Sequence, residues 1–208
     1  LAGCAAQRSP DLPPLEVVPR IDLARYMGTW HEIASFPTWF QKGCIASTAA
    51  YALRDDGRVG VLNQCYKGSI DNPDSASGTA WVVDPATNAK LRVQFFWPFS
   101  GDYWIIDLGP GYEYAVVGHP SREYLWILSR SPQMDEARFE RILTRLKQQH
   151  YDTRRLVHYP RSNCPFCLGD DLDWTEASGR GTLYTFTIAR RPTQLKAIVD
   201  TGSTTCTN

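Results

Sequence analysis

The chain has 208 residues, of which 43% are hydrophobic and 12% aromatic. This suits one globular domain of about 150 residues with a remainder. Its 22 basic and 22 acidic residues cancel and form no basic block, which argues against nucleic acid or a polybasic membrane contact as partner. Charged residues interrupt each hydrophobic segment, so no run reaches the roughly 18 apolar residues of a transmembrane helix.

The N-terminus has the form of a bacterial lipobox. The letters LAGC lead through small residues to Cys4, where a signal peptidase would cut before the cysteine that carries lipid. Residues 1–3 would be a remnant of the signal peptide, and the Pro-rich residues up to 19 a tether. Ala5 is not the aspartate that retains such lipoproteins in the inner membrane. We therefore expect the protein at the periplasmic face of the outer membrane. A chance tetrapeptide is the alternative.

Eight short hydrophobic runs follow, separated by turn signals such as Asp56 and Gly57, which suit a tight hairpin. The alternation within the runs indicates antiparallel strands, each pairing with the next. The runs are 28–36, 45–54, 58–66, 77–84, 90–97, 102–108, 113–118 and 123–130. Closure of this sheet into a barrel would remove its exposed edges and leave room for one small ligand. The alternative is a sandwich of two sheets with a filled interior. The predicted fold class is all-β, an eight-stranded up-and-down antiparallel β-barrel.

One amphipathic helix is predicted after the last run. Ser131 can cap it, and Pro132 suits its first position. Four apolar residues then share one face at helical spacing: Phe139, Ile142, Leu143 and Leu146. We expect this helix to pack against the outside of the barrel.

Several motifs occur in order along the same region. They are GTWHEIA from Gly28, YALRDDG and VLNQ at the first hairpin, FFWPFSGDYWII in the middle and YLWILSR before the helix. Together they resemble the bacterial outer-membrane lipoprotein lipocalins and the apolipoprotein D-like lipocalins. His31 departs from the tyrosine that is usual there. The resemblance covers residues 20–160, which it implies form one lipocalin domain.

The resemblance also implies how the barrel is closed. In that family the first strand starts and the eighth strand ends at the closed end, so Gly28, Trp30 and Arg130 should meet there. An arginine that stacks on indole and donates to backbone carbonyls would close the floor. The alternative makes Trp30 an ordinary core residue and gives Arg130 no special role.

A ligand-binding set follows from the same resemblance. Tyr51, Asn63 and Trp126 match positions that line the cavity in similar lipocalins. By parity Trp126 and Leu128 share one face, and a three-residue hairpin loop would bring Tyr51 and Asn63 near opposition. Phe95 completes the set. A phenol, an amide and an indole among apolar walls suit an amphiphile with one polar end, although each could instead be a core residue.

The opposite end should be the mouth, formed by residues 37–44, 67–76, 97–103 and 118–122. Two of these loops carry the aromatic stretches FPTWF and FFWPF, which either touch lipid at the entrance or cover the barrel. Cys44 and Cys65 also lie at this end. We predict a disulfide between them in an exported protein, with a bulge near Gly43 that brings them together.

The sequence holds little sign of catalysis. It has no nucleophile elbow, P-loop or zinc-protease motif, and its four histidines are scattered. Glu32 and Asp107 could face the interior, but two carboxylates alone do not define acid-base chemistry. We therefore predict no enzymatic activity, no metal site and no cofactor.

Residues 161–208 are predicted to be a partly disordered tail of unrelated origin. Residues 164–192 resemble a fragment of a zinc-ribbon and OB-fold protein associated with acyl-CoA, but the second cysteine pair of a ribbon is missing. The letters DTGS at 200–203 match an aspartic protease motif by coincidence, because the rest of such a site is absent. If the tail were the working part, the barrel would be the carrier of an acyl-CoA or zinc module.

The predicted function is lipid storage or transport in the cell envelope by a lipid-anchored lipocalin. Its expected partners are a fatty acid, lysophospholipid or similar amphiphile, and the membrane reached through Cys4. No nucleic acid is expected, and the sequence leaves a dimer open. The alternatives are a lipocalin-fold enzyme acting on a bound lipid and a structural module with a filled barrel.

Overall fold

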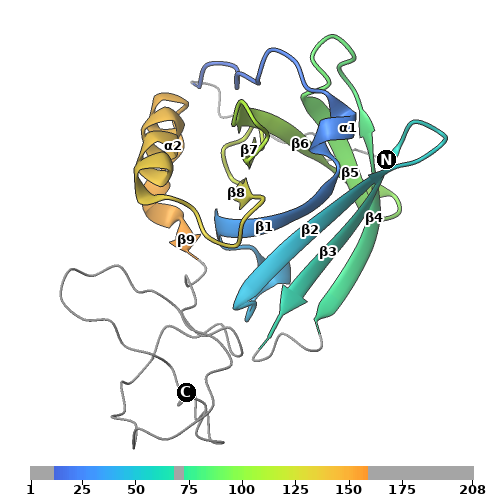
Figure 1. Ribbon diagram of the computed structural model, residues 1–208, viewed down its shortest axis with the longest axis horizontal. Coiled ribbons are helices and arrows are strands. Elements are labelled where there is room, and N and C mark those ends of the chain that lie inside the picture. Colours follow the sequence, from blue (N-terminus) through green and yellow to red (C-terminus); the bar gives the residue numbers. More distant parts are fainter. Residues whose placement is uncertain (1–11, 68–72, 159–208) are drawn as a thin grey trace, which may run out of the picture.

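The computed structural model describes residues 12–67 and 73–158, which form a β-barrel with a helix against its outside (Figure 1). The barrel strands are β1 (Gly28–Ser35), β2 (Ala46–Leu53), β3 (Val59–Tyr66), β4 (Asp74–Val82), β5 (Lys90–Phe96), β6 (Phe99–Leu108), β7 (Tyr114–Gly118) and β8 (Leu125–Ser129). Each corresponds to one predicted run. The predicted lipobox at Cys4, the start of the tether and the tail 161–208 lie outside the described residues.

The sheet closes on itself through its first strand. Each strand pairs antiparallel with the next, and β1 pairs with both β2 and β8. Gly28 lies opposite Tyr51 on one side, and His31 lies opposite Ser129 on the other. The predicted eight-stranded up-and-down barrel is therefore confirmed. A further short strand, β9 (Val157–His158), pairs with the end of β1; two residues carry no periodic signal, and it was not predicted.

The register of the first hairpin differs from the expectation. Its loop has three residues, 55–57, and Gly57 adopts a φ of 76° there. Tyr51 pairs with Val61 and not near Asn63, so the expected opposition was wrong by two residues. A shift of two residues keeps each side chain on its face, so Tyr51 and Asn63 still share the inner face.

Residues 12–22 run along the outside of the barrel toward its closed end. The backbone N–H groups of Val18 and Ile21 donate to carbonyls of β6 and of the β4–β5 loop. The short helix α1 (Leu23–Tyr26) follows, capped by the side chain of Asp22, and turns the chain into β1. Two 3-10 turns, η1 (Trp39–Gln41) and η2 (Thr153–Arg155), lie in the connections after β1 and after the long helix.

The long helix α2 (Glu136–Gln148) begins later than predicted. Its N-cap is Asp135, whose side chain accepts a hydrogen bond of 3.0 Å from the N–H of Arg138. Ser131 and Pro132 lie in the preceding connection, so their expected places at the helix start were wrong. Asp135 combines the capping hydrogen bond with a negative charge at the positive end of the helix dipole, which explains why the helix starts there.

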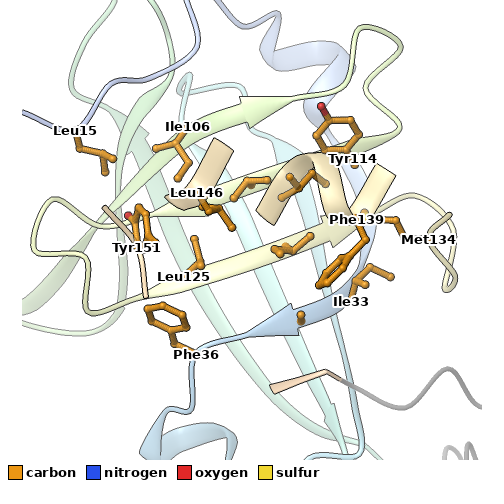
Figure 2. Packing of buried hydrophobic residues seen from close by; sticks show 14 residues of the cluster. Leu15, Ile33, Phe36, Ile106, Tyr114, Leu125, Met134, Phe139, Leu146 and Tyr151 are labelled. Atoms are coloured by element: carbon orange, nitrogen blue, oxygen red, sulfur yellow. The ribbon is translucent and has the colours of Figure 1, made fainter. Parts of the chain in front are cut away.

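The outer core lies between α2 and the barrel wall. Phe139, Ile142 and Leu146 pack against buried residues of β1, β6, β7 and β8, as Figure 2 shows for the labelled side chains. Leu143, which was also expected on this face, lies at the edge of the contact. The helix thus packs outside the barrel as predicted, and a separate inner cluster fills the closed end.

The side chain of Asp107 lies on the outer side of the barrel, next to α2. The sequence had suggested that it could face the interior. Nη1 of Arg145 donates to both of its carboxylate oxygens, at 2.7 and 2.9 Å. The register of β6 shifts between Ile105 and Asp107, so the alternation that would place Asp107 inside is broken there. The resulting ion pair joins α2 to the barrel wall.

Candidate functional site

An arginine stacked on a tryptophan closes one end of the barrel. Trp30 is fully buried, and the guanidinium carbon of Arg130 lies 3.7 Å from the centroid of its ring. Nη2 of Arg130 donates to three carbonyls at the end of α1, at 2.7 to 3.1 Å, and Nη1 donates to the carbonyl of Thr29 at 2.9 Å. The end of a helix leaves carbonyls without partners inside the helix, and a planar guanidinium can bind several of them.

Gly28 lies beside this stack. Its φ of 96° is unfavourable for residues with a side chain, and a Cβ here would lie 3.3 Å from Nη1 of Arg130. The structure therefore brings together the three residues that the family resemblance assigned to the closed end. The indole N–H of Trp30 donates to the carbonyl of Tyr26 (2.9 Å), which ties the stack to α1.

Three tyrosines line the floor next to Trp30. The hydroxyl of Tyr103 lies 2.8 Å from that of Tyr26 and 3.0 Å from that of Tyr51. Loss of hydration raises the pKa of Tyr51 to about 12 and raises the pKa of the other two well above the usual tyrosine value. The cluster is therefore neutral at physiological pH, and its hydroxyls act as hydrogen-bond donors and acceptors.

Sequence reasoning missed two members of this cluster. Tyr103 could have been found, because alternation in DYWIIDL puts it on the same face as Ile105. Tyr26 precedes the first strand and carried no periodic signal.

All five residues of the predicted ligand-binding set face the barrel interior by strand register. Tyr51 and Leu128 are buried near the floor, whereas Asn63, Phe95 and Trp126 lie nearer the mouth and are only half-buried. An inward-facing side chain keeps solvent exposure only where the space around it is not filled. The interior is therefore accessible from the mouth, which argues against a completely filled barrel.

Small residues form much of the wall at this level. Four of them occupy inward-facing positions: Ala49, Ala76, Gly78 and Gly101. The ring of Phe95 lies across Gly78, where a Cβ would come within 2.8 Å of the ring. Large residues at these positions would take up the interior, so the wall is suited to a ligand.

A hydrogen-bond network extends inside the barrel near the mouth. Nε2 of Gln41, in η1, donates to Oε2 of Glu32 at 2.7 Å. Oε1 of Gln41 accepts hydrogen bonds from the indole N–H of Trp126 (3.2 Å) and from the hydroxyl of Thr38 (2.9 Å). Glu32 was considered for the interior from the sequence. Gln41 was missed, because a loop residue carries no periodicity that would reveal its direction.

A disulfide holds this loop to the barrel rim. Cys44 and Cys65 are bridged, as predicted, with their Cα atoms 5.3 Å apart. Cys65 lies opposite Ser47, and the chain bends at Gly43, whose φ is 84°. The bend brings Cys44 back to β3 and fixes the loop that carries Gln41.

Aromatic side chains at the mouth are turned toward solvent. Trp39 is 85% exposed and Trp97 is 87% exposed, and they lie in the β1–β2 loop and the β5–β6 turn. Phe40, Phe96 and Phe99 beside them are also exposed. These five residues, which we call the aromatic rim, do not cover the barrel, which was one of the two interpretations of the sequence.

Other features of the described residues offer no competing site. A shallow groove of about 500 Å³ lies outside the closed end, and its lining is Arg20, Ile21, Asp22, Leu23, Asn88 and Tyr112. It is an open hollow away from the inward-facing residues. Within residues 12–67 and 73–158 no group of three His, Cys, Asp or Glu side chains could hold a metal ion. The helices in the same ranges are too short or too polar to cross a membrane.

Comparison with known families agrees with this geometry. Residues 21–161 match the family model of the lipocalin-like domain. The chain belongs to the lipocalin family. Lipocalins are in general ligand-binding proteins without enzymatic activity, so a small hydrophobic ligand is the expected partner of the interior.

Two relatives and one solved structure show how this lipocalin compares with others. Temperature-induced lipocalin-1 of Arabidopsis thaliana is 39% identical over 160 residues, 73% of this chain and 85% of the relative. Outer membrane lipoprotein Blc of Escherichia coli K12 is 38% identical over 147 residues, 70% and 83% respectively. Insecticyanin from the tobacco hornworm Manduca sexta has a TM-score of 0.57 at 19% identity, covering 71% of this chain and 84% of its own, and shares the fold. The family and fold predicted from the sequence are confirmed.

Proposed function

We propose that this lipocalin binds a single-chain amphiphile, such as a fatty acid or a lysophospholipid, and stores or transports lipid in the cell envelope. The observation that carries the proposal is a barrel closed at one end by Trp30 and Arg130, with inward-facing residues that stay half-exposed toward the other end. Transfer of an acyl chain from water into the barrel is favourable by roughly 25 cal/mol per Å² of apolar surface removed from water. This free energy supports micromolar binding after the costs of association are subtracted.

The order of residues along the interior supports one orientation of the ligand. Val61 and Leu128 are apolar and lie near the floor, whereas Asn63 and Trp126 add polar groups nearer the mouth. In the proposed complex the acyl chain points to the floor and the head group to the mouth. This is the arrangement expected when a few polar groups fix an otherwise apolar ligand.

We further propose that the protein is held at the periplasmic face of the outer membrane by lipid on Cys4. The lipobox letters and the Pro-rich tether support this, and so does the name of the Escherichia coli relative, an outer membrane lipoprotein. The aromatic rim supports exchange of the ligand with a lipid surface, because exposed Trp and Phe side chains favour the membrane interface.

A titration of the full chain with a fluorescent fatty acid analogue tests the proposed binding. Trp126→Ala should weaken binding about fivefold or more, the equivalent of about 1 kcal/mol of lost apolar contact. Trp81→Ala is the matched control, because Trp81 lies on the outer face of β4 and should leave the affinity unchanged. Competition with lysophosphatidylcholine should displace the analogue in the wild type. Absence of saturable binding in the wild type would refute the proposed function.

A further inference from the structure

Several polar groups of the interior near the mouth can accept hydrogen bonds. Glu32 places a carboxylate there. Oγ of Ser47 and Oδ1 of Asn63 are buried, and neither has a hydrogen-bond partner among the described residues. The three residues lie on β1, β2 and β3, which are adjoining strands. A buried acceptor without a donor is costly, so the carboxylate of Glu32 and Oδ1 of Asn63 favour a ligand that brings donors, whereas the hydroxyl of Ser47 can pair with either kind of group.

Glu32 provides an acidic group on the inner face of the barrel strands. In β1 to β8, none of the inward-facing positions given by the strand register holds a lysine, arginine or histidine. Burial raises the pKa of Tyr51, and the carboxylate of Glu32 adds to this rise. An anionic head group placed beside Glu32 would meet a group of like charge.

A side chain of the protein already occupies the space between Glu32 and Trp126. The amide of Gln41 donates to Oε2 of Glu32 and accepts from Nε1 of Trp126. An amide both donates and accepts, and this position uses both functions. A ligand head group with the same pair of functions could replace the amide of Gln41, whose side chain would then turn away from Glu32 and Trp126 while the disulfide keeps its loop at the rim.

We propose that Glu32 and Trp126 form a head-group site and that the side chain of Gln41 fills this site when no ligand is bound. The site selects amphiphiles with donor-bearing head groups over carboxylates. This inference rests on the proposed function and adds the chemical class of the ligand. A hydroxyl or amide head group can donate to Glu32 and accept from Trp126, and an ammonium group can form a charge-assisted hydrogen bond with Glu32. A carboxylate can only accept, so of the two groups Glu32 and Trp126 it can pair with the indole alone.

The test compares three amphiphiles with the same 12-carbon tail, each below its critical micelle concentration, on the full chain. They are dodecylamine, monododecanoylglycerol and dodecanoate, and they are measured by displacement of one fluorescent fatty acid analogue. The amine and the glycerol ester should bind about tenfold tighter than dodecanoate, because only dodecanoate places a like charge near Glu32. Equal affinity of the three would overturn the selectivity and leave amphiphile binding intact. Failure of all three to bind would reject the proposed function as well.

Two variants locate the selectivity. Glu32→Gln keeps the shape and removes the charge, so the ratio of amine to dodecanoate affinity should fall about tenfold, whereas Glu140→Gln on the exposed side of α2 should leave the ratio unchanged. An unchanged ratio in a natively folded E32Q protein would overturn the role of Glu32. Gln41→Ala should tighten all three probes about threefold, because the competing amide is gone. Unchanged affinities in Q41A would overturn the competition and provide a readout even if E32Q did not fold.

Discussion

Arg130 links three parts of the protein that are distant in sequence. Its guanidinium covers the indole of Trp30, and its N–H groups bind carbonyls at the end of α1 and at Thr29 in β1. A hydrophobic residue could cover the indole, but it would leave those carbonyls without donors. A lysine would keep the charge but has no planar fork with which to reach several carbonyls.

We expect Arg130→Met to lower the free energy of unfolding by about 2 to 3 kcal/mol, since hydrogen bonds to a charged donor are lost and partly buried carbonyls remain. The free energy of unfolding of Arg130→Lys should lie between those of Arg130→Met and the wild type. Urea denaturation followed by tryptophan fluorescence measures these values, and Arg141→Met, on the exposed side of α2, is the control. A loss in R130M no larger than in R141M would show that Arg130 is an ordinary surface residue.

The sequence revealed residues that belong to motifs or to alternating strands, and it missed those whose direction depends on tertiary contacts. Trp30 and Arg130 were found through the motifs at the two strand ends. Gln41 points into the barrel only because the Cys44–Cys65 bridge and the hydrogen bond to Glu32 hold its loop. No local pattern in the sequence records such a contact.

At the scale of elements, strand alternation predicted the eight strands but not the irregularities within them. The shift in β6 moved Asp107 to the outer face, where it binds Arg145 of α2. A bulge is one inserted residue, so it reverses the face of every following side chain without changing the composition of the strand. The predicted start of the helix was wrong for a related reason. Ser131 and Asp135 are both acceptable N-caps in a sequence, and only packing in the folded protein chooses between them.

The choice of cap can be tested directly. Asp135→Ala should lower the free energy of unfolding by about 1 kcal/mol, because the N–H of Arg138 loses its acceptor and the helix dipole loses a favourable charge. Ser131→Ala should cost distinctly less, since Ser131 lies outside the helix. Chemical denaturation of both variants measures the difference, and a larger cost for S131A would return the helix start to the predicted position.

At the scale of the whole molecule, the two ends of the barrel differ in the exposure of their aromatic residues. The closed end holds the buried stack of Trp30 and Arg130 and the tyrosine cluster, and the mouth carries the aromatic rim on two separate loops. Exposed aromatic residues at both loops cost solubility and add nothing to the core. Contact with a lipid surface would bury them and would bring the opening of the barrel to the source of the ligand.

This contact predicts a specific effect of the rim. In the full chain with Cys4→Ser, which cannot be acylated, Trp39→Ser together with Trp97→Ser should lower partitioning onto phosphatidylcholine vesicles about tenfold or more, since two large aromatic surfaces no longer leave water. Leu53→Ser with Val83→Ser is the matched control, because these exposed apolar residues lie at the closed end. Vesicle co-sedimentation measures the partitioning. Both double variants should bind soluble amphiphile as the wild type does, because the four side chains are exposed and the hydrogen bonds that join Gln41 to Glu32 and Trp126 do not involve them. Equal partitioning of the two double variants would contradict a lipid contact through the mouth, and the lipid on Cys4 would then be the sole proposed attachment to the membrane.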